Sequence, residues 1–167
     1  MLFGGSRRPG VTTGIRCEHN GGMTDPHILG PGLLPTPFTA DEIREATGTG
    51  KTIRMRMDAA DGSVAFRVNR FREVDAEGAT LDRWAEETPG DVSSNRVTWA
   101  ELQGHAAFDA ETTSVSTEVL RIPLGEVNCL RFDTEDGVFW FSLAHPGMPV
   151  RYESEGLRTT VISVDYD

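Results

Sequence analysis

A histidine with nearby carboxylates is the first group in this sequence that could do chemistry. His105 and Asp109 lie four residues apart and could share a helical face, and Glu101 offers a second carboxylate. A histidine assisted by a carboxylate can act as a general base, so a hydrolase-like enzyme is one hypothesis. A single histidine with a single carboxylate is more often a surface or capping pair. We therefore expect no bound metal ion and no cofactor.

A second set of residues combines arginines with tryptophans and suits ligand binding. A guanidinium group presents a planar fork that matches a carboxylate or a phosphate. Aromatic rings can line a ligand groove, although they also fill most protein cores. The candidate ligand-binding residues are Arg70, Arg72, Trp84, Trp99, Arg131 and Trp140.

The string GTGKT at residues 48–52 resembles the end of a phosphate-binding P-loop. That motif requires a glycine at the position that Glu45 occupies here, and it requires a strand before the loop and a helix after it. In this sequence a predicted helix precedes the string and a predicted strand follows it. We therefore expect a helix stop and a turn, with no nucleotide site.

The two cysteines favour neither a disulfide nor a nucleophile. Cys17 and Cys129 lie 112 positions apart. Cys17 with His19 lacks a second ligand pair at the spacing of a zinc finger. Cys129 stands in an apolar strand, which predicts a buried and inert thiol. This cysteine usage, together with the lack of a signal-like apolar stretch, leads us to expect a cytoplasmic protein.

The charge balance excludes some partners. The chain has 167 residues and a formal net charge of −10, whereas nucleic acids and anionic membranes are bound by cationic faces. No window approaches the ~20 apolar residues of a membrane span. We therefore expect no nucleic acid partner and no membrane span.

The composition divides the chain into three segments. Residues 1–22 carry a positive balance, and we expect a disordered extension that precedes a possible start at Met23. Residues 23–38 are punctuated by proline and predict an extended lead-in. Residues 39–167 hold all the regular patterning and predict a single domain.

Two short helices are indicated by their N-terminal signals. Thr39 with Glu42 forms a capping-box pattern that predicts a helix over residues 40–47, with Gly48 in a left-handed C-terminal position. The same Thr-x-x-Glu pattern begins at Thr98 and predicts a helix over 99–107.

From Thr52 onward the apolar period is two, which is typical of strands. Ile53, Met55 and Met57 form one inward set, and the Asp61-Gly62 turn leads into a second set of Val64, Phe66 and Val68. Continuing that phase brings Arg70 and Arg72 inward, unless a bulge near Asn69 resets it. Phe139-Trp140-Phe141 predicts a strand that is covered on both faces or lines a cavity. The further strands are predicted at 80–87, 114–122, 127–133, 138–143 and 157–165.

These elements predict an α+β fold: a strongly curved antiparallel sheet, or half-barrel, of six to eight strands with one or two short helices. The stretch IPLGEVNCLRF at 122–132, the FWF strand at 139–141 and PGMPVRYE at 146–153 resemble a pattern in uncharacterised bacterial proteins. Those proteins look similar to the lipoprotein-localisation type. The resemblance implies a half-barrel around a short helix and carries no catalytic signature.

Three functional hypotheses remain open. The first is a non-enzymatic protein that binds a small apolar or amphipathic ligand on the concave face of the sheet. The second is the hydrolase-like enzyme that uses His105 with Asp109 or Glu101. The third is a protein-interaction module that uses a strand edge or an acidic face.

Overall fold

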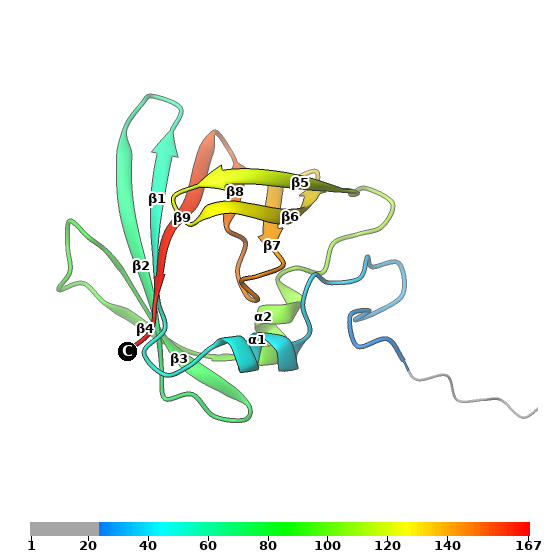
Figure 1. The fold of residues 1–167 in the computed structure, drawn as a ribbon, viewed down its shortest axis with the longest axis horizontal. Helices are drawn as coiled ribbons and strands as arrows, with labels where there is room; N and C mark the ends of the chain where they lie inside the picture. The colour runs from blue at the N-terminus through cyan, green and yellow to red at the C-terminus, as the bar shows by residue number, and fades with distance from the viewer. Residues whose placement is uncertain (1–23) are drawn as a thin grey trace, which may run out of the picture.

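The structure is a computed structural model that describes residues 24–167, so the expected extension at 1–22 lies outside the described residues. Two short helices and nine strands follow one another along the chain (Figure 1). Their bounds are α1 Ala40–Ala46, β1 Thr52–Ala59, β2 Val64–Arg72, β3 Gly78–Ala85, β4 Ser93–Thr98, α2 Trp99–Gly104, β5 Ser114–Ile122, β6 Gly125–Asp133, β7 Val138–Ser142, β8 Arg151–Ser154 and β9 Leu157–Asp165.

All nine strands form one antiparallel sheet in the order β4-β3-β2-β1-β9-β8-β7-β6-β5. The sheet is open, because β4 and β5 are its edges and do not pair with each other. The predicted α+β class with an antiparallel sheet is therefore confirmed. The predicted count of six to eight strands is wrong.

The additional strands have weak local signals. β4 reads SSNRVT, which is mostly polar and exposed, and it pairs with β3 at the edge of the sheet. β8 has only four residues and follows a run rich in glycine and proline. Neither segment alternates over enough residues to stand out as a strand.

Both predicted capping boxes are present. The Thr39 hydroxyl accepts a hydrogen bond from the Glu42 amide while the Glu42 carboxylate accepts one from the Thr39 amide, and Thr98 and Glu101 repeat the arrangement. The second helix ends at Gly104, earlier than predicted. The left-handed glycine after the first helix is Gly50 with a φ of 83°, so the expectation for Gly48 is wrong.

The register of β1 and β2 corrects the predicted inward set of the second strand. Ile53 lies opposite Asn69 and Arg54 lies opposite Val68, with no shift along the pair. Residues directly opposite each other share a face, so Val64, Phe66 and Val68 lie on the face of Arg54. The expected bulge near Asn69 is absent, and the irregularity falls between β1 and β9 instead.

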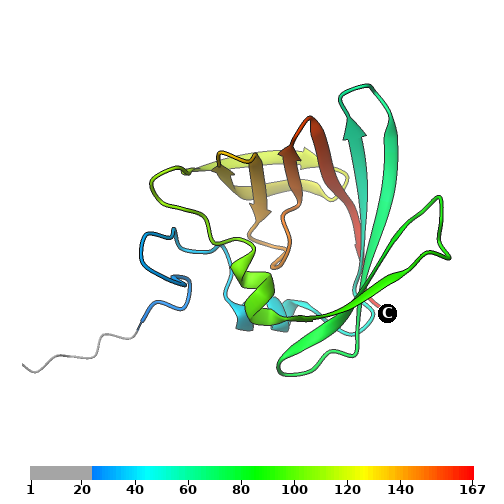
Figure 2. The same cartoon turned by 180° about the vertical axis from the view of Figure 1, so that it is seen from behind.

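The two helices lie side by side against one face of the sheet. Figures 1 and 2 show them below β7 and β8 and beside β3, with β5 and β6 running across the far end of the molecule. One apolar core joins the helices to both halves of the sheet, and its buried members include Ile43, Met55, Leu81, Phe132 and Phe141. No helix within residues 24–167 is both long enough and apolar enough to cross a membrane.

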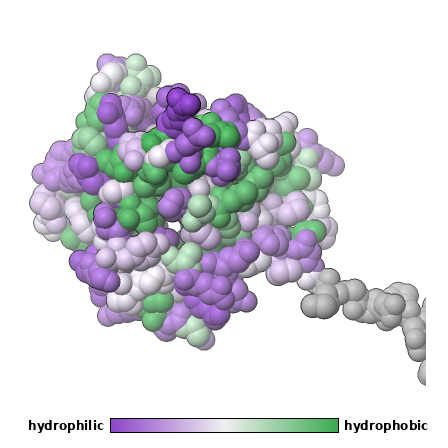
Figure 3. All heavy atoms as spheres, viewed as in Figure 1, coloured by the Kyte–Doolittle hydropathy of each residue, from purple (hydrophilic) through white to green (hydrophobic). Residues whose placement is uncertain are grey.

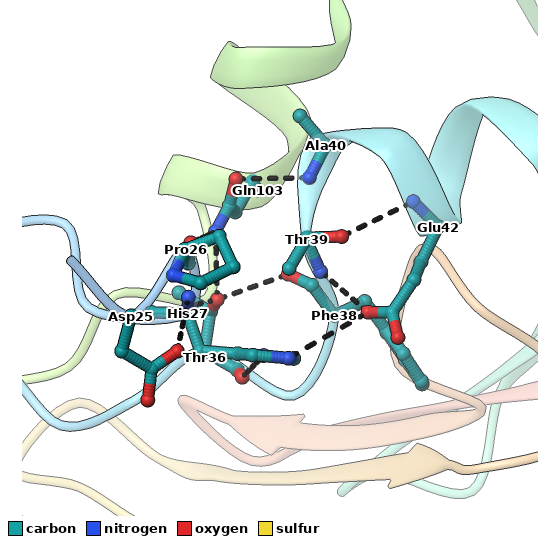
Figure 4. A network of polar contacts seen from close by, with 9 residues as sticks. All are labelled: Asp25, Pro26, His27, Thr36, Phe38, Thr39, Ala40, Glu42 and Gln103. Carbon is teal, nitrogen blue, oxygen red and sulfur yellow. Dashed lines mark hydrogen bonds and ion pairs between the residues drawn. The ribbon is translucent and has the colours of Figure 1, made fainter. Parts of the chain in front are cut away.

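The lead-in before α1 is fastened to both helices by one buried amide (Figure 4). The Gln103 side chain donates to the Pro26 carbonyl at 2.8 Å and to the Thr36 hydroxyl at 2.9 Å. Its oxygen accepts from the Ala40 amide at the start of α1. The His27 ring lies 2.8 Å from the Thr36 carbonyl and completes the network. The helices are thereby held in place against the sheet.

Candidate functional site

A cavity of about 320 Å³ lies between the helices and one face of the sheet. Its walls come from α1, α2, β1, β2, β3, β7 and β8, together with the turn at residues 147–149. Figure 3 shows the surface hollowed near the centre of the view, between the strands above and the helices below. The volume is at the lower end of the range found for small-molecule sites, ~300–1,000 Å³.

Most of the cavity wall is apolar. Aromatic rings provide one side: Phe108 packs against Phe139 with centroids 5.2 Å apart, and Phe141 lies edge-on to Phe132 at 5.6 Å. The apolar lining residues that the strands contribute are Ile53, Met55, Phe71, Leu81, Phe139 and Phe141. Such a wall favours the apolar part of a ligand.

Three polar side chains stand together on the wall that β2 and β3 provide. Asn69 lies directly opposite Arg83 in the register, and Arg67 precedes Asn69 by two residues on the same face. Asn69 is buried, and among the described residues its Oδ1 atom has no hydrogen-bond partner. Its amide nitrogen is 4.0 Å from the Met148 sulfur. The three side chains form a cationic group with one unsatisfied acceptor, which we call the Arg67 group.

Within residues 24–167, the two arginines of this group differ from most others. Nine of the twelve arginines there form ion pairs with carboxylates, whereas Arg67, Arg83 and Arg151 form none. Arg151 donates instead to the Thr160 hydroxyl at 3.3 Å. Arg67 and Arg83 are exposed enough to remain hydrated while they line the cavity. Their guanidinium groups are available for an external anion.

Lys51 supplies a further cationic group at the same cavity. The residue is 5% exposed, and its Nζ donates to the Ala46 carbonyl at 3.2 Å. The Tyr166 ring lies 5.9 Å from Nζ, a distance at which a cation–π contact is still favourable. Burial lowers the pKa of Lys51 to about 8. Within the described chain no carboxylate pairs with it.

Three of the predicted ligand-binding residues lie on the face opposite the cavity. Arg72 pairs with Asp82 at 2.7 Å, and Arg70 pairs with Asp167. Trp84 is opposite Val68 in the register and shares its face. The hydrogen bonds from Arg72 and Ser94 hold the pKa of Asp82 below its usual value. The expectation that Arg70 and Arg72 point inward is wrong, because the whole phase of β2 is reversed.

Arg131 and Trp140 lie together on that same outer face. The Arg131 guanidinium stacks over the Trp140 ring at 5.2 Å and pairs with Asp133 at 2.8 Å. The Trp140 indole donates to the Glu118 carboxylate at 2.6 Å and, together with Arg131, holds the pKa of Glu118 below its usual value. Phe139 and Phe141 point to the cavity side, so the prediction of a strand covered on both faces is confirmed.

Trp99, the last of the predicted ligand-binding residues, begins α2 and is buried. Its indole donates to the Asp75 carbonyl at 3.0 Å. The structure therefore places none of the six predicted residues on the cavity wall.

The structure brings His105 to the cavity but gives the proposed carboxylates other partners. The Asp109 carboxylate accepts from the Glu111 amide at 2.7 Å. The Glu101 carboxylate accepts from the Thr98 amide at 2.8 Å, which lowers the pKa of Glu101. Within residues 24–167 His105 forms no ion pair with a carboxylate. The arrangement does not assemble a general base with its orienting acid.

Cys129 and the acidic turns offer no reactive site. Cys129 is 2% exposed and burial raises the pKa of its thiol, as expected for an inert strand cysteine. The residues that line an open hollow beside β8 include the acidic residues Asp58, Asp133, Glu135, Asp136, Glu153 and Glu155. Within the described part of the chain, no three His, Cys, Asp or Glu side chains are placed to hold a metal ion.

The sequence contains signals for the residues that do line the cavity. Lys51 continues the alternation of Ile53, Met55 and Met57 by two positions, so it belongs to their face. Arg67 and Asn69 fall in phase with the buried Phe71. These signals can be interpreted only when the register of β1 and β2 is known. The apolar pattern of β2 predicts the wrong face for its residues. Arg83 follows the buried Leu81 by two positions and therefore falls in phase with it.

Comparisons with known protein families and with curated protein sequences find no match to this chain. The site is therefore interpreted from its own geometry.

Proposed function

We propose that this protein binds a small amphipathic anion, with the apolar part of the ligand in the cavity and its carboxylate or phosphate at the Arg67 group. One observation carries the proposal: Arg67 and Arg83 line an apolar cavity and have no carboxylate partner within residues 24–167, although the net charge of the chain is −10. In such an acidic chain, unpaired arginines are exceptions. A guanidinium pair beside an apolar wall matches a head group and a tail.

Asn69 supports the same position for the head group. Asn69 lies opposite Arg83 and two residues from Arg67, and within residues 24–167 its buried side-chain oxygen has no hydrogen-bond partner. A buried unsatisfied polar atom costs roughly 1–3 kcal/mol, so its persistence calls for an explanation. A protonated oxygen of a phosphate, or a hydroxyl next to a carboxylate, could donate to Asn69 while the arginines donate to the anion.

The proposal includes the curved form of the sheet. Residues of β1, β2 and β3 line the cavity together with residues of β7 and β8, although these strands belong to opposite halves of the sheet. Their convergence on one space supports a half-barrel with a hollow side partly covered by α1 and α2. This is the arrangement that the resemblance to the lipoprotein-localisation type implies.

Ligand binding is favoured over the hydrolase-like enzyme because the two carboxylates proposed to assist His105 have other hydrogen-bond partners. His105 lines the cavity, but the hydrogen bonds of Asp109 and Glu101 are made to backbone amides. A hydrolase needs its base oriented and a group that stabilises the transition state. A binding protein needs only the apolar wall and the arginine pair.

The test is calorimetric titration with three ligands that share one tail: decanoate, decanol and decylammonium. We expect decanoate to bind most tightly. The double variant R67Q/R83Q should weaken decanoate binding by roughly 10–100-fold, because a charged hydrogen bond is worth ~1.5–3 kcal/mol. It should leave decanol binding unchanged.

Arg56→Gln is the matched control, since Arg56 lies on the outer face of β1 and pairs with Asp58 at 2.8 Å. It should bind decanoate like the unmodified protein. Equal affinity of R67Q/R83Q and R56Q for decanoate would contradict the proposal. So would tighter binding of decylammonium than of decanoate.

A further inference from the structure

Lys51 is unusual within this chain. It is the only lysine among 16 basic residues, and it is one of the few buried charged side chains of the structure. It lies on the wall of the cavity that holds the Arg67 group and also lines a small neighbouring cavity with Ile53 and Met148. The proposed anion site does not require it. Its position therefore suggests an additional role.

The surroundings of Lys51 disfavour an ammonium ion. An ammonium has three hydrogens to donate, yet Nζ has one hydrogen-bond acceptor, the Ala46 carbonyl. The Tyr166 hydroxyl also donates to that carbonyl at 3.2 Å, so the acceptor is shared. The titratable or charged side chains around the two cavities are Arg67, Arg83, His105, His145, Tyr152 and Tyr166, and none is a carboxylate. Asp167 lies beside Gly50 but pairs with Arg70.

A neutral amine in an apolar cavity is a nucleophile. The pKa of about 8 leaves Lys51 mostly protonated near neutral pH, but its unprotonated fraction is far larger than that of an ordinary lysine. Amines activated in this way by desolvation react with carbonyl compounds. The chemistry needs no metal, oxidant or reductant.

We propose that Lys51 is a covalent capture site for an aldehyde that carries an anionic group, with the anion held at the Arg67 group and the carbonyl carbon at the lysine Nζ. Nζ forms a bond to the carbonyl carbon. The carbonyl oxygen then leaves as water with the two hydrogens of the amine, and a neutral imine remains. The reverse reaction with water releases the aldehyde. The inference rests on the proposed function for the binding of the anionic end.

The dimensions of the site fit a short bifunctional ligand. Arg67 lies opposite Met55, and Met55 follows Lys51 by four residues, which is about 13 Å along a strand. Lysine and arginine both have long side chains, so the distance between the amine and the guanidinium group can be much shorter than this backbone interval. A compact probe for both groups is an aromatic ring with an aldehyde and a carboxylate on opposite sides, whose apolar ring also suits the apolar wall.

The experiment traps the imine with cyanoborohydride, which adds a hydride to the imine and leaves a stable secondary amine. The probes are 4-carboxybenzaldehyde and benzaldehyde, and intact mass with peptide mapping locates the adduct. We expect one adduct, at Lys51, with at least ~10-fold faster labelling by the carboxylated probe. Lys51→Arg should abolish it. Peptide mapping separates this adduct from one at the N-terminal amine.

The double variant R67Q/R83Q distinguishes the two proposals. It should remove the preference for the carboxylated probe and keep slow labelling of Lys51 by benzaldehyde. Labelling of Lys51 no faster than that of Nα-acetyl-lysine methyl ester would overturn the capture site, even if decanoate binding depends on the arginines. Fast labelling at Lys51 without any preference between the probes would retain a reactive lysine and overturn the anion site. Thermal melting of each variant verifies that it is folded.

Discussion

The arginines on the two faces of the sheet differ in whether they have partners within the protein. On the outer face Arg54 pairs with Glu86 and stacks over Phe66 at 4.6 Å, and Arg131 pairs with Asp133 while it covers Trp140. On the cavity face Arg67 and Arg83 have neither a carboxylate nor a ring as partner among the described residues. The outer arginines therefore complete the structure of the sheet, and the inner arginines are left to interact with something else.

This difference explains how an acidic chain can present a cationic site. Carboxylates are abundant in the sequence, but the strand register places those of β1 and β3, Asp58 and Asp82, on the outer face. A short-range ion pair between side chains of the same protein would compete with an external anion. The separation of the two faces removes this competition from the cavity.

The largest expected effect belongs to the outer face. Trp140→Ala should lower the free energy of unfolding by roughly 3–5 kcal/mol, because the ring is buried and its indole donates to Glu118. Urea unfolding followed by circular dichroism measures the change. Trp140→Phe keeps a ring for Arg131 and should lose less. A loss below about 1 kcal/mol for the alanine variant would mean that the outer face contributes little to stability.

A smaller effect, of opposite sign, is expected for Lys51→Met on the cavity face. Near neutral pH the folded protein retains a buried charge, so its replacement should raise the free energy of unfolding by roughly 1–3 kcal/mol. Between pH 8 and 10.5 the unfolded chain binds more protons at this residue than the folded chain, because the folded pKa is about 8 and the ordinary value is 10.5. The contribution of Lys51 to stability therefore becomes more favourable as pH rises through this window.

Urea midpoints measured from pH 7 to pH 10 test this behaviour. The difference between the Lys51→Met variant and the unmodified protein should shrink as pH rises. A difference that is constant over this range would mean that Lys51 titrates as an ordinary lysine.

The smallest expected effect is that of Asn69→Leu. The substitution removes a buried oxygen without a partner and keeps a similar volume, so the free energy of unfolding should rise by about 1 kcal/mol. Decanoate binding should weaken in the same variant if Asn69 serves the head group. Thermal denaturation and calorimetry measure the two effects. A variant that is destabilised would indicate that Asn69 makes a structural hydrogen bond in solution.

The sequence predicts the elements better than it predicts the site. Capping boxes and turns depend on neighbouring residues, so Thr39 with Glu42 and the Asp61-Gly62 turn could be identified without the fold. Which residues of β2 point to the cavity and which point outward could not be predicted in this way. On the outer face an arginine side chain from the neighbouring strand can cover an apolar residue, as Arg54 covers Phe66. From the sequence alone, such a residue cannot be distinguished from one that points into the core.

The arginines of the cavity could not be predicted for a related reason. Arg54 and Arg67 both stand in strands of mixed polar and apolar residues, and what separates them is the absence, for Arg67, of a partner that lies elsewhere in the sequence. The partner Glu86 is 32 residues away from Arg54. Pairing of this kind follows from strand order and register, which only the folded chain defines.

The side-chain amide of Gln103 joins the two helices to the lead-in that precedes α1. Its side chain joins Pro26, Thr36 and Ala40, so a shortened chain that began at Thr39 would leave a buried amide with two donors unsatisfied. The two helices would then lose the hydrogen bonds that join them to the lead-in, and the cavity would lose support for the wall that the helices provide. Anyone who trims or transplants this domain should therefore keep the polypeptide from Asp25 onward.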